Sequence, residues 1–196
     1  MSERAAGSRL TLAVDCATPY LALALVDEDG RVLGRFAAEV GREHATRLVP
    51  ELHALTAGVP GWRGRLALVV AGVGPGSYTG LRVALATASG LARAVGAEVR
   101  GAPTFAALAA GVLAPGEDAV VTLDARRGNV YAAHCRRAPG PEDVAPSVAL
   151  LAGPVKLPAA EAGSLAPGAR VLPAGTPDAA ALAASAAEGP PAAIYL

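Results

Sequence analysis

The sequence predicts an α/β protein: a mixed β-sheet with flanking helices, followed by a smaller second lobe. Three observations predict this class. Near the N-terminus, apolar segments separated by short turns have the pattern of a β-meander. Further along, segments with helical periodicity alternate with short apolar runs, as in folds that combine helices with buried strands. In the second half, short apolar segments are separated by Pro- and Gly-rich stretches, which are typical of a loop-rich lobe.

The first three strands are expected to form an antiparallel meander. Leu10 to Asp15 alternates apolar residues and ends on an acid, and Tyr20 to Val26 is a second strand rich in Leu and Ala. Asp27 to Gly30 is a turn, because its glycine tolerates the positive φ that a tight hairpin requires. Arg31 to Ala38 then returns as the third strand.

Helices and strands alternate after the meander. A helix is predicted from about His44 to Ala57, a strand buried on both faces from Leu66 to Ala71, and a long helix from Thr79 to about Val95. A short strand, Glu98 to Gly101, and a helix opened by Pro103 follow. The order βββαβαβα is the ribonuclease-H-like pattern of the actin, sugar kinase and Hsp70 superfamily, an analogy of fold and not of function.

The second half is expected to form the smaller lobe. Ala119 to Leu123 and Val130 to Cys135 are predicted to pair around a turn at Asp124 to Asn129. We place the lobe boundary so that residues 1–102 form the ribonuclease-H-like lobe and residues 103–196 the smaller one. Further short segments are Val148 to Leu151, Val171 to Ala174 and Ala179 to Ala187.

Composition restricts the function classes. Hydrophobic residues make up 53% of the 196 residues but aromatic residues only 4%, so small aliphatic side chains must build the core. Lys plus Arg equals Asp plus Glu, 17 each, which argues against strong independent RNA binding but leaves room for a local patch. The two cysteines are far apart and no apolar run reaches the ~18 residues of a membrane span, so we expect a reduced, cytoplasmic protein that does not enter the membrane.

A glycine-rich turn follows the buried strand and precedes the long helix. It has no Lys-Ser or Lys-Thr after its last glycine, so it is not a Walker A loop, and its glycines are too close for a dinucleotide fingerprint. Two interpretations remain open: a tight turn whose Ser77 or Thr79 caps the helix, or a cradle that binds an anion on backbone N–H groups. The candidate residues of this turn are Gly74, Pro75, Gly76, Ser77, Thr79 and Arg82.

We expect no catalytic residue, metal or cofactor. Asp15 and Asp124 both end strands and could in principle share a metal, but no glycine lies between Asp15 and Tyr20, which weakens an ATPase interpretation. His44 and His53 fall on opposite faces of one helix and cannot bind one metal together. Ser77 lacks the Gly-x-Ser-x-Gly elbow of serine hydrolases.

The pattern of the helices indicates binding to a protein partner instead. The helix from Thr79 to Val95 is apolar nearly all round, which indicates burial on more than one side, either by its own lobe alone or also by another subunit. Small residues four apart would permit close helix contact. The candidate partner-binding residues are His44, Leu48, Leu52, Leu55, Gly80, Leu81, Ala84, Ala88 and Leu91.

Several motifs, in order along nearly the whole chain, resemble one family. They are Leu12–Thr18 at the opening strand, Gly41–Pro50 with its Arg-x-His and Leu-Val-Pro, Val73–Arg82 with Gly-Pro-Gly-Ser-Tyr-Thr-Gly-Leu-Arg, Asp124–Tyr131, and Tyr195–Leu196. Together they identify the chain as similar to the TsaB (YeaZ) family, which is related by sequence to M22 glycoproteases.

The resemblance implies an actin-like fold that has lost catalysis and needs no cofactor. It also implies a role as scaffold and activating partner of the catalytic subunit TsaD and the ATPase TsaE, which together form threonylcarbamoyladenosine in tRNA. The chain would contact tRNA only through that complex and would form a homodimer when alone. Two alternatives are an active actin-like ATPase or sugar kinase, disfavoured by the missing phosphate-loop glycines, and an M22-type peptidase, disfavoured by the missing histidine ligands.

Overall fold

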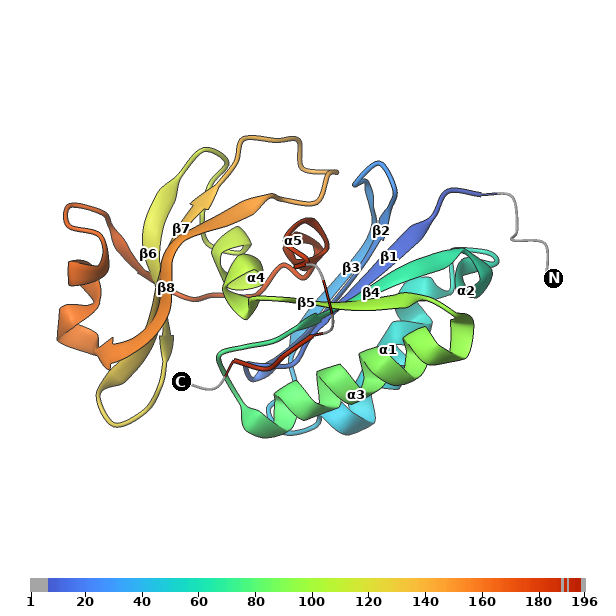
Figure 1. The fold of residues 1–196 in the computed structure, drawn as a ribbon, viewed down its shortest axis with the longest axis horizontal. Coiled ribbons are helices and arrows are strands. Elements are labelled where there is room, and N and C mark those ends of the chain that lie inside the picture. The colour runs from blue at the N-terminus through green and yellow to red at the C-terminus, as the bar shows by residue number, and fades with distance from the viewer. Residues whose placement is uncertain (1–6, 188, 190, 195–196) are drawn as a thin grey trace.

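The first sheet contains the predicted meander. The computed structural model describes residues 7–187, 189 and 191–194 (Figure 1). Strand order is β3-β2-β1-β4-β5, with β1 to β3 antiparallel and β4 and β5 parallel to β1. The mixed sheet and its order confirm the predicted α/β class and the actin-like pattern. The strands are β1 (Leu10–Asp15), β2 (Tyr20–Asp27), β3 (Val32–Glu39), β4 (Leu66–Gly72) and β5 (Glu98–Ala102).

Helices cover both faces of this sheet (Figure 1). On one face lie α1 (His44–Thr56), α2 (Trp62–Arg65) and α3 (Tyr78–Val95), packed on the sheet through a shared core. On the other face lie α4 (Thr104–Ala110) and α5 (Ala180–Ala184). The sequence did not predict α2, because Gly58 and Pro60 indicated the end of helical structure; in the structure they lie between α1 and α2.

The second sheet repeats the connectivity of the first. Its order is β8-β7-β6-β9, with three antiparallel strands, then a 3-10 helix η1, then a strand parallel to β6. Strand β8 is much longer than the predicted Val148–Leu151 segment, and η1 was not predicted. The elements are β6 (Asp118–Asp124), β7 (Asn129–Arg137), β8 (Val148–Pro158), η1 (Ala159–Leu165) and β9 (Val171–Pro173).

One core joins the two sheets. Ala13 and Val70 from the first sheet, Phe105 from α4, Val121 from β6 and Leu182 from α5 are all fully buried in the same cluster. After β9 the chain returns to the first sheet, where the backbone N–H of Ile194 donates to the carbonyl of Val73 at 2.7 Å. The last part of the chain therefore packs on the first lobe, although the boundary predicted after residue 102 assigned it to the second lobe.

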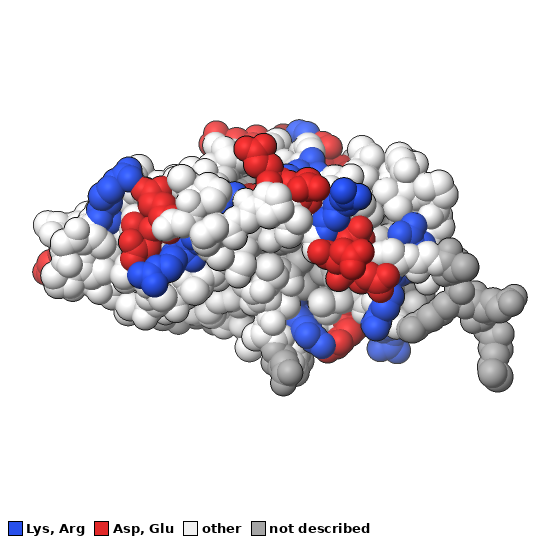
Figure 2. All heavy atoms as spheres, turned by 90° about the horizontal axis from the view of Figure 1, so that it is seen from above, with Lys and Arg blue, Asp and Glu red and all other residues white. Residues whose placement is uncertain are grey.

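Charges of both signs are mixed on the surface. Figure 2 shows acidic and basic side chains side by side on the face seen from above. Exposed ion pairs join Arg31 to Asp143 at 3.6 Å and Arg136 to Asp118 at 3.0 Å. Among the helices of the described residues, none combines the length and the apolar character needed to cross a bilayer.

Candidate functional site

The glycine-rich turn connects the end of β4 to the start of α3. Gly74 has a φ of 94°, and its N–H donates to the Thr104 hydroxyl at 3.1 Å. Ser77 is the N-cap of α3, and its hydroxyl accepts from the N–H of Gly80 at 3.2 Å. The Ser77 interpretation of a capped turn is therefore confirmed.

The turn is packed against the connection between β1 and β2. A Cβ added to Gly76 would overlap the carbonyl oxygen of Ala17, and one added to Gly80 would overlap that of Cys16. The N–H of Ser77 also donates to the Ala17 carbonyl, at 2.7 Å. Since the N–H groups of Gly74, Ser77 and Gly80 all donate within the chain, the geometry favours a structural turn over an anion cradle.

Asp15 lies beneath the turn and is completely buried. Its carboxylate accepts from the Thr104 hydroxyl at 2.7 Å and from the Ala17 N–H at 2.8 Å. Burial raises the pKa of this carboxyl, and the two hydrogen bonds partly offset the rise. The carboxylate is thus held by the fold itself.

Asp124 occupies the matching position at the end of β6. Its carboxylate accepts from the N–H of Arg126 at 2.9 Å, two residues on, as Asp15 accepts from Ala17. Unlike Asp15, it is exposed. No group of three or more His, Cys, Asp and Glu side chains suited to a metal occurs within the described residues, so the structure does not support a shared metal site.

The surroundings of the histidines and cysteines indicate roles in the fold and not in chemistry. His44 is buried and its Nε2 donates to the carbonyl of Tyr20 at 3.1 Å, whereas His53 is exposed, so the predicted opposite orientation is confirmed. His134 Nε2 lies 3.3 Å from the Asp118 carboxylate. Burial raises the pKa of the Cys135 thiol to about 12 and raises that of the Cys16 thiol further still.

Most of the nominated partner-binding residues face inward. Seven of the nine are buried against the chain's own sheet, and Ala88 is only 1% exposed; Leu55 and Leu91 are partly buried. The seven buried residues, whose assignment to an exposed surface was wrong, are His44, Leu48, Leu52, Gly80, Leu81, Ala84 and Ala88. Helical periodicity identified one face of each helix correctly but could not show that this face meets the sheet.

The opposite face of the same two helices is exposed and short of charge. Val49 on α1 is 62% exposed, which is unusual for so large an apolar side chain. We define the outer helix face as Ala45, Val49 and His53 on α1 with Ala86 and Gly90 on α3, all exposed. Sequence reasoning missed this face because Ala and Gly on both sides of α3 make the two sides look alike.

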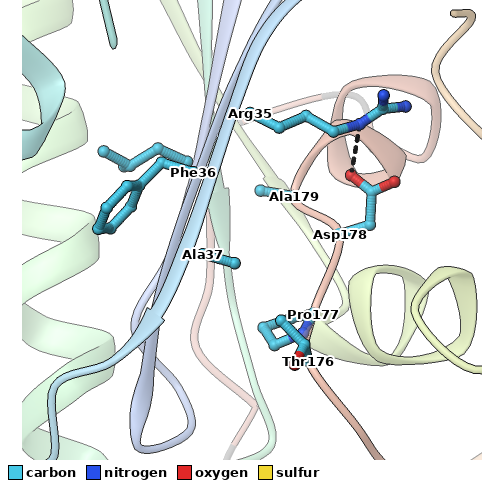
Figure 3. Close-up of a pocket in the computed structure, with 8 residues that line it drawn as sticks. Arg35, Phe36, Ala37, Thr176, Pro177, Asp178 and Ala179 are labelled. Carbon is cyan, nitrogen blue, oxygen red and sulfur yellow. Dashed lines mark hydrogen bonds and ion pairs between the residues drawn. The ribbon is translucent and has the colours of Figure 1, made fainter. Parts of the chain in front are cut away.

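A small pocket lies between β3 and the segment that precedes α5 (Figure 3). Its volume is about 260 Å³, and Arg35 Nε donates to Asp178 across it at 3.3 Å. Figure 3 shows Phe36 pointing to the other side of β3, away from the ion pair. The pocket joins β3 to the returning chain and contains neither a nucleophilic thiol nor a metal-binding cluster among the residues that line it.

Comparisons with known proteins agree with one another. Residues 34–150 match the family described as TsaD, tRNA N6-adenosine threonylcarbamoyltransferase. An uncharacterized protein of Mycobacterium tuberculosis is 37% identical over 138 residues, 70% of this chain and 63% of that relative. The tRNA threonylcarbamoyladenosine biosynthesis protein TsaB of Bacillus subtilis is 31% identical over 126 residues, 61% of this chain and 52% of the relative.

A solved structure shares the fold. YeaZ from Pseudomonas aeruginosa superimposes with a TM-score of 0.72 at 24% identity, covering 90% of this chain and 89% of that one. The match thus spans 63% and 52% of the lengths of the two curated relatives named above, but 89% of this solved structure. The Tyr195–Leu196 motif lies outside the described residues.

Proposed function

Because this chain belongs to the TsaB (YeaZ) branch of the TsaD family, we propose that it is a non-catalytic partner subunit in the formation of threonylcarbamoyladenosine in tRNA. Its partners in this proposal are a TsaD-like catalytic subunit and a TsaE-like ATPase. The names of the Bacillus subtilis and Escherichia coli relatives support the pathway. The division of labour between subunits is our inference from the site.

One observation supports the non-catalytic role. The region where an actin-like enzyme would bind phosphate is filled by contacts and hydrogen bonds within the chain itself. The Asp15 carboxylate is buried and accepts two hydrogen bonds from the chain. The glycine-rich turn touches the backbone at Cys16 and Ala17, which leaves no space there for even a Cβ. A phosphate group is larger than a methyl group and would need the turn and the β1–β2 connection to separate.

The surface that suits a partner is the outer helix face. It combines small side chains with exposed Val49, and the small residues of α3 allow another helix to approach closely. We propose that the catalytic subunit binds this face, and that the free chain forms an isologous homodimer through the same face, so that the two assemblies compete. A partner with two helices of its own would complete a four-helix contact.

Co-purification tests the proposal. The chain is expressed with the TsaD-like subunit of the same organism, and tRNA modification is measured by nucleoside mass spectrometry with and without this chain. We expect a stable complex and modification that depends on the chain. Undiminished modification without it, or no complex at all, would contradict the proposal.

An assay of the isolated chain tests the absence of catalysis. We expect no steady hydrolysis of ATP or of peptides, because Asp15 is inaccessible to a substrate. ATP turnover by the pure chain that disappears in the Asp15→Ala variant would instead assign it to the actin-like ATPases.

A further inference from the structure

The connection between β6 and β7 has an unusual backbone. Arg126 and Arg127 have φ values of 66° and 54°, and Gly128 follows at 74°. Within the described residues, these two arginines are the only non-glycine residues with positive φ. Such a conformation is disfavoured for a residue with a long side chain and persists only where the surroundings impose it.

Hydrogen bonds from neighbouring residues impose this conformation. The Asp124 carboxylate accepts from the N–H of Arg126 at 2.9 Å, and the Asn129 side-chain amide donates to the carbonyl of Arg127 at 3.3 Å. The carbonyl of Gly128 accepts from the N–H of Ala159 at 2.9 Å, which joins the turn to the start of η1. The turn is therefore held through its backbone, and neither arginine side chain is needed to hold it.

Both arginine side chains are exposed and form no ion pair, although the Asp124 carboxylate in the same turn offsets one of the two charges. No carboxylate lies within ion-pair distance of either guanidinium among the described residues. Lys156, exposed on β8, adds a third positive charge nearby: it is opposite Tyr131 in the β7–β8 register, with its Nζ 5.8 Å from the centre of the Tyr131 ring. We call Arg126, Arg127 and Lys156 the basic tip.

The other end of the same strands is neutralised. There Arg136 pairs with Asp118 and Arg170 pairs with Glu117. Arg137, at this same end, forms no ion pair and donates instead to the carbonyls of Ala110 and Leu113. Among the described residues, the exposed arginines of the second sheet without an ion pair are therefore Arg126 and Arg127, at the opposite end. A protein with zero formal net charge therefore still presents a local cationic site.

We propose that the basic tip binds the phosphodiester backbone of RNA. The identity of that RNA as the tRNA substrate rests on the function proposed above. A direct contact of this kind departs from the expectation, drawn from the family resemblance, that the chain meets tRNA only through the complex. Guanidinium and ammonium groups on an exposed, backbone-held turn suit phosphate oxygens, and phosphate contacts need no apolar surface. A protein partner would bury an apolar centre, but the turn from Asp124 to Asn129 contains no large apolar side chain: four of its six residues are polar and the other two are Ala125 and Gly128. The fixed backbone limits the positions that both guanidinium groups can reach before RNA arrives.

Equilibrium binding of a labelled, unmodified tRNA transcript to the full chain alone tests the proposal. Fluorescence anisotropy is measured at several KCl concentrations between about 50 and 200 mM. The test variant is Arg126→Asn/Arg127→Asn, because Asn tolerates positive φ and removes both charges. The matched control is Arg42→Asn/Arg93→Asn, which removes two exposed arginines from the first sheet's side of the molecule. Circular dichroism verifies that every variant is folded.

We expect the test variant to bind about tenfold more weakly at the lowest salt concentration, and the slope of log affinity against log salt to fall by about two. Lys156→Ala should lower the slope by about one. The control variant should bind as the wild type does. Absence of tRNA binding by the wild-type chain, or equal losses in test and control variants, would overturn the proposal.

Co-purification with the TsaD-like subunit distinguishes the RNA-binding proposal from the proposed function as a partner subunit. The basic-tip variant should still co-purify with that subunit. A variant that binds tRNA normally but loses the subunit would assign the tip to a protein contact and overturn the RNA assignment. Failure of the wild-type chain to bind the subunit would instead contradict the proposed function, while the tRNA measurement would stand by itself.

Discussion

Single glycines set how closely β1, β4 and α3 approach each other. In the glycine-rich turn the positive φ belongs to Gly74, whereas Gly76 and Gly80 are required by the carbonyl groups of Ala17 and Cys16. Gly76 and Gly80 are thus structural residues because of close backbone contacts and not because of an unusual φ. A backbone carbonyl cannot move aside as a flexible side chain can.

This contact predicts opposite effects for two glycines on one helix. Gly80→Ala should lower the free energy of unfolding by about 3 kcal/mol or more, because the methyl group overlaps the backbone at Cys16. Gly90→Ala should raise it by about 0.5–1 kcal/mol, because no atom lies within 4 Å of the added Cβ and alanine favours the helix. Urea unfolding measures both. Similar values for the two variants would show that the close approach at Cys16 does not exist in solution.

Asp15 predicts a pH dependence of stability. Its pKa is raised in the folded chain, so the folded state binds a proton more tightly than the unfolded state does. The contribution of Asp15 to stability is complete below the unfolded pKa and is lost as pH rises through the raised folded pKa. Asp15→Asn should remove this contribution, so the difference between wild type and variant should shift in the variant's favour as pH rises from about 4 to 8. A difference that is constant across this range would contradict the prediction.

The two thiols should be unreactive in the folded protein. Cys16 and Cys135 are fully buried, and burial raises the pKa of both, to about 12 for Cys135, so almost no thiolate forms at neutral pH. We expect no reaction with Ellman's reagent until denaturant is added, when both of the chain's cysteines should titrate. Fast labelling of either thiol under native conditions would show that the core opens readily.

At the level of elements, α3 has two apolar faces with different roles. One face packs on the sheet through Ala84, Ala88 and Ala92, whose small side chains let the helix lie close to the strands. The other face is exposed at Ala86 and Gly90. Ala88, which we first assigned to the partner surface, belongs to the inner face.

The same substitution at two positions of α3 separates these roles. Ala88→Glu should prevent folding or cost several kcal/mol, because the carboxylate would be buried without a partner. Ala86→Glu should leave the fold intact and weaken both the homodimer and the complex with the catalytic subunit. Circular dichroism and analytical size exclusion measure the two effects. As a matched control, Val171→Glu places a charge on an exposed apolar position of β9 and should affect neither assembly. A folded Ala86→Glu variant with unchanged assembly would place the partner surface elsewhere.

At the level of the whole molecule, the lobes depend on one another for burial. The face of the first sheet that carries Ala13 and Val70 is covered by α4 and α5, which come from the second half of the chain. A fragment of residues 1–102 would expose that face to water. The loss of buried apolar area removes the main driving force for folding.

We therefore expect fragment 1–102 to lack a cooperative thermal transition, although its sequence contains the complete predicted first lobe. The full chain should unfold in one transition, because both sheets contribute to a common core. Differential scanning calorimetry of both proteins is the measurement. A fragment with its own sharp transition would establish residues 1–102 as an independent domain.

The sequence alone determined the kind and order of most elements, the parallel and antiparallel parts of the first sheet, and the family. These follow from local information: apolar alternation marks strands, helical spacing marks helices, and the Val73–Arg82 motif marks the turn between them. The elements that sequence missed, α2 and η1, are short segments in Pro- and Gly-rich surroundings, where local patterns carry little information.

Only the tertiary structure decided which helix face is buried, which glycine needs a positive φ, and how the end of the chain returns to the first sheet. Periodicity relates the faces of a helix to each other but not to the sheet, and in α3 alanine and glycine make both faces appear apolar. The close contacts at Cys16 and Ala17 join residues about sixty positions apart. Contacts of that kind arise from packing, and no local pattern encodes them.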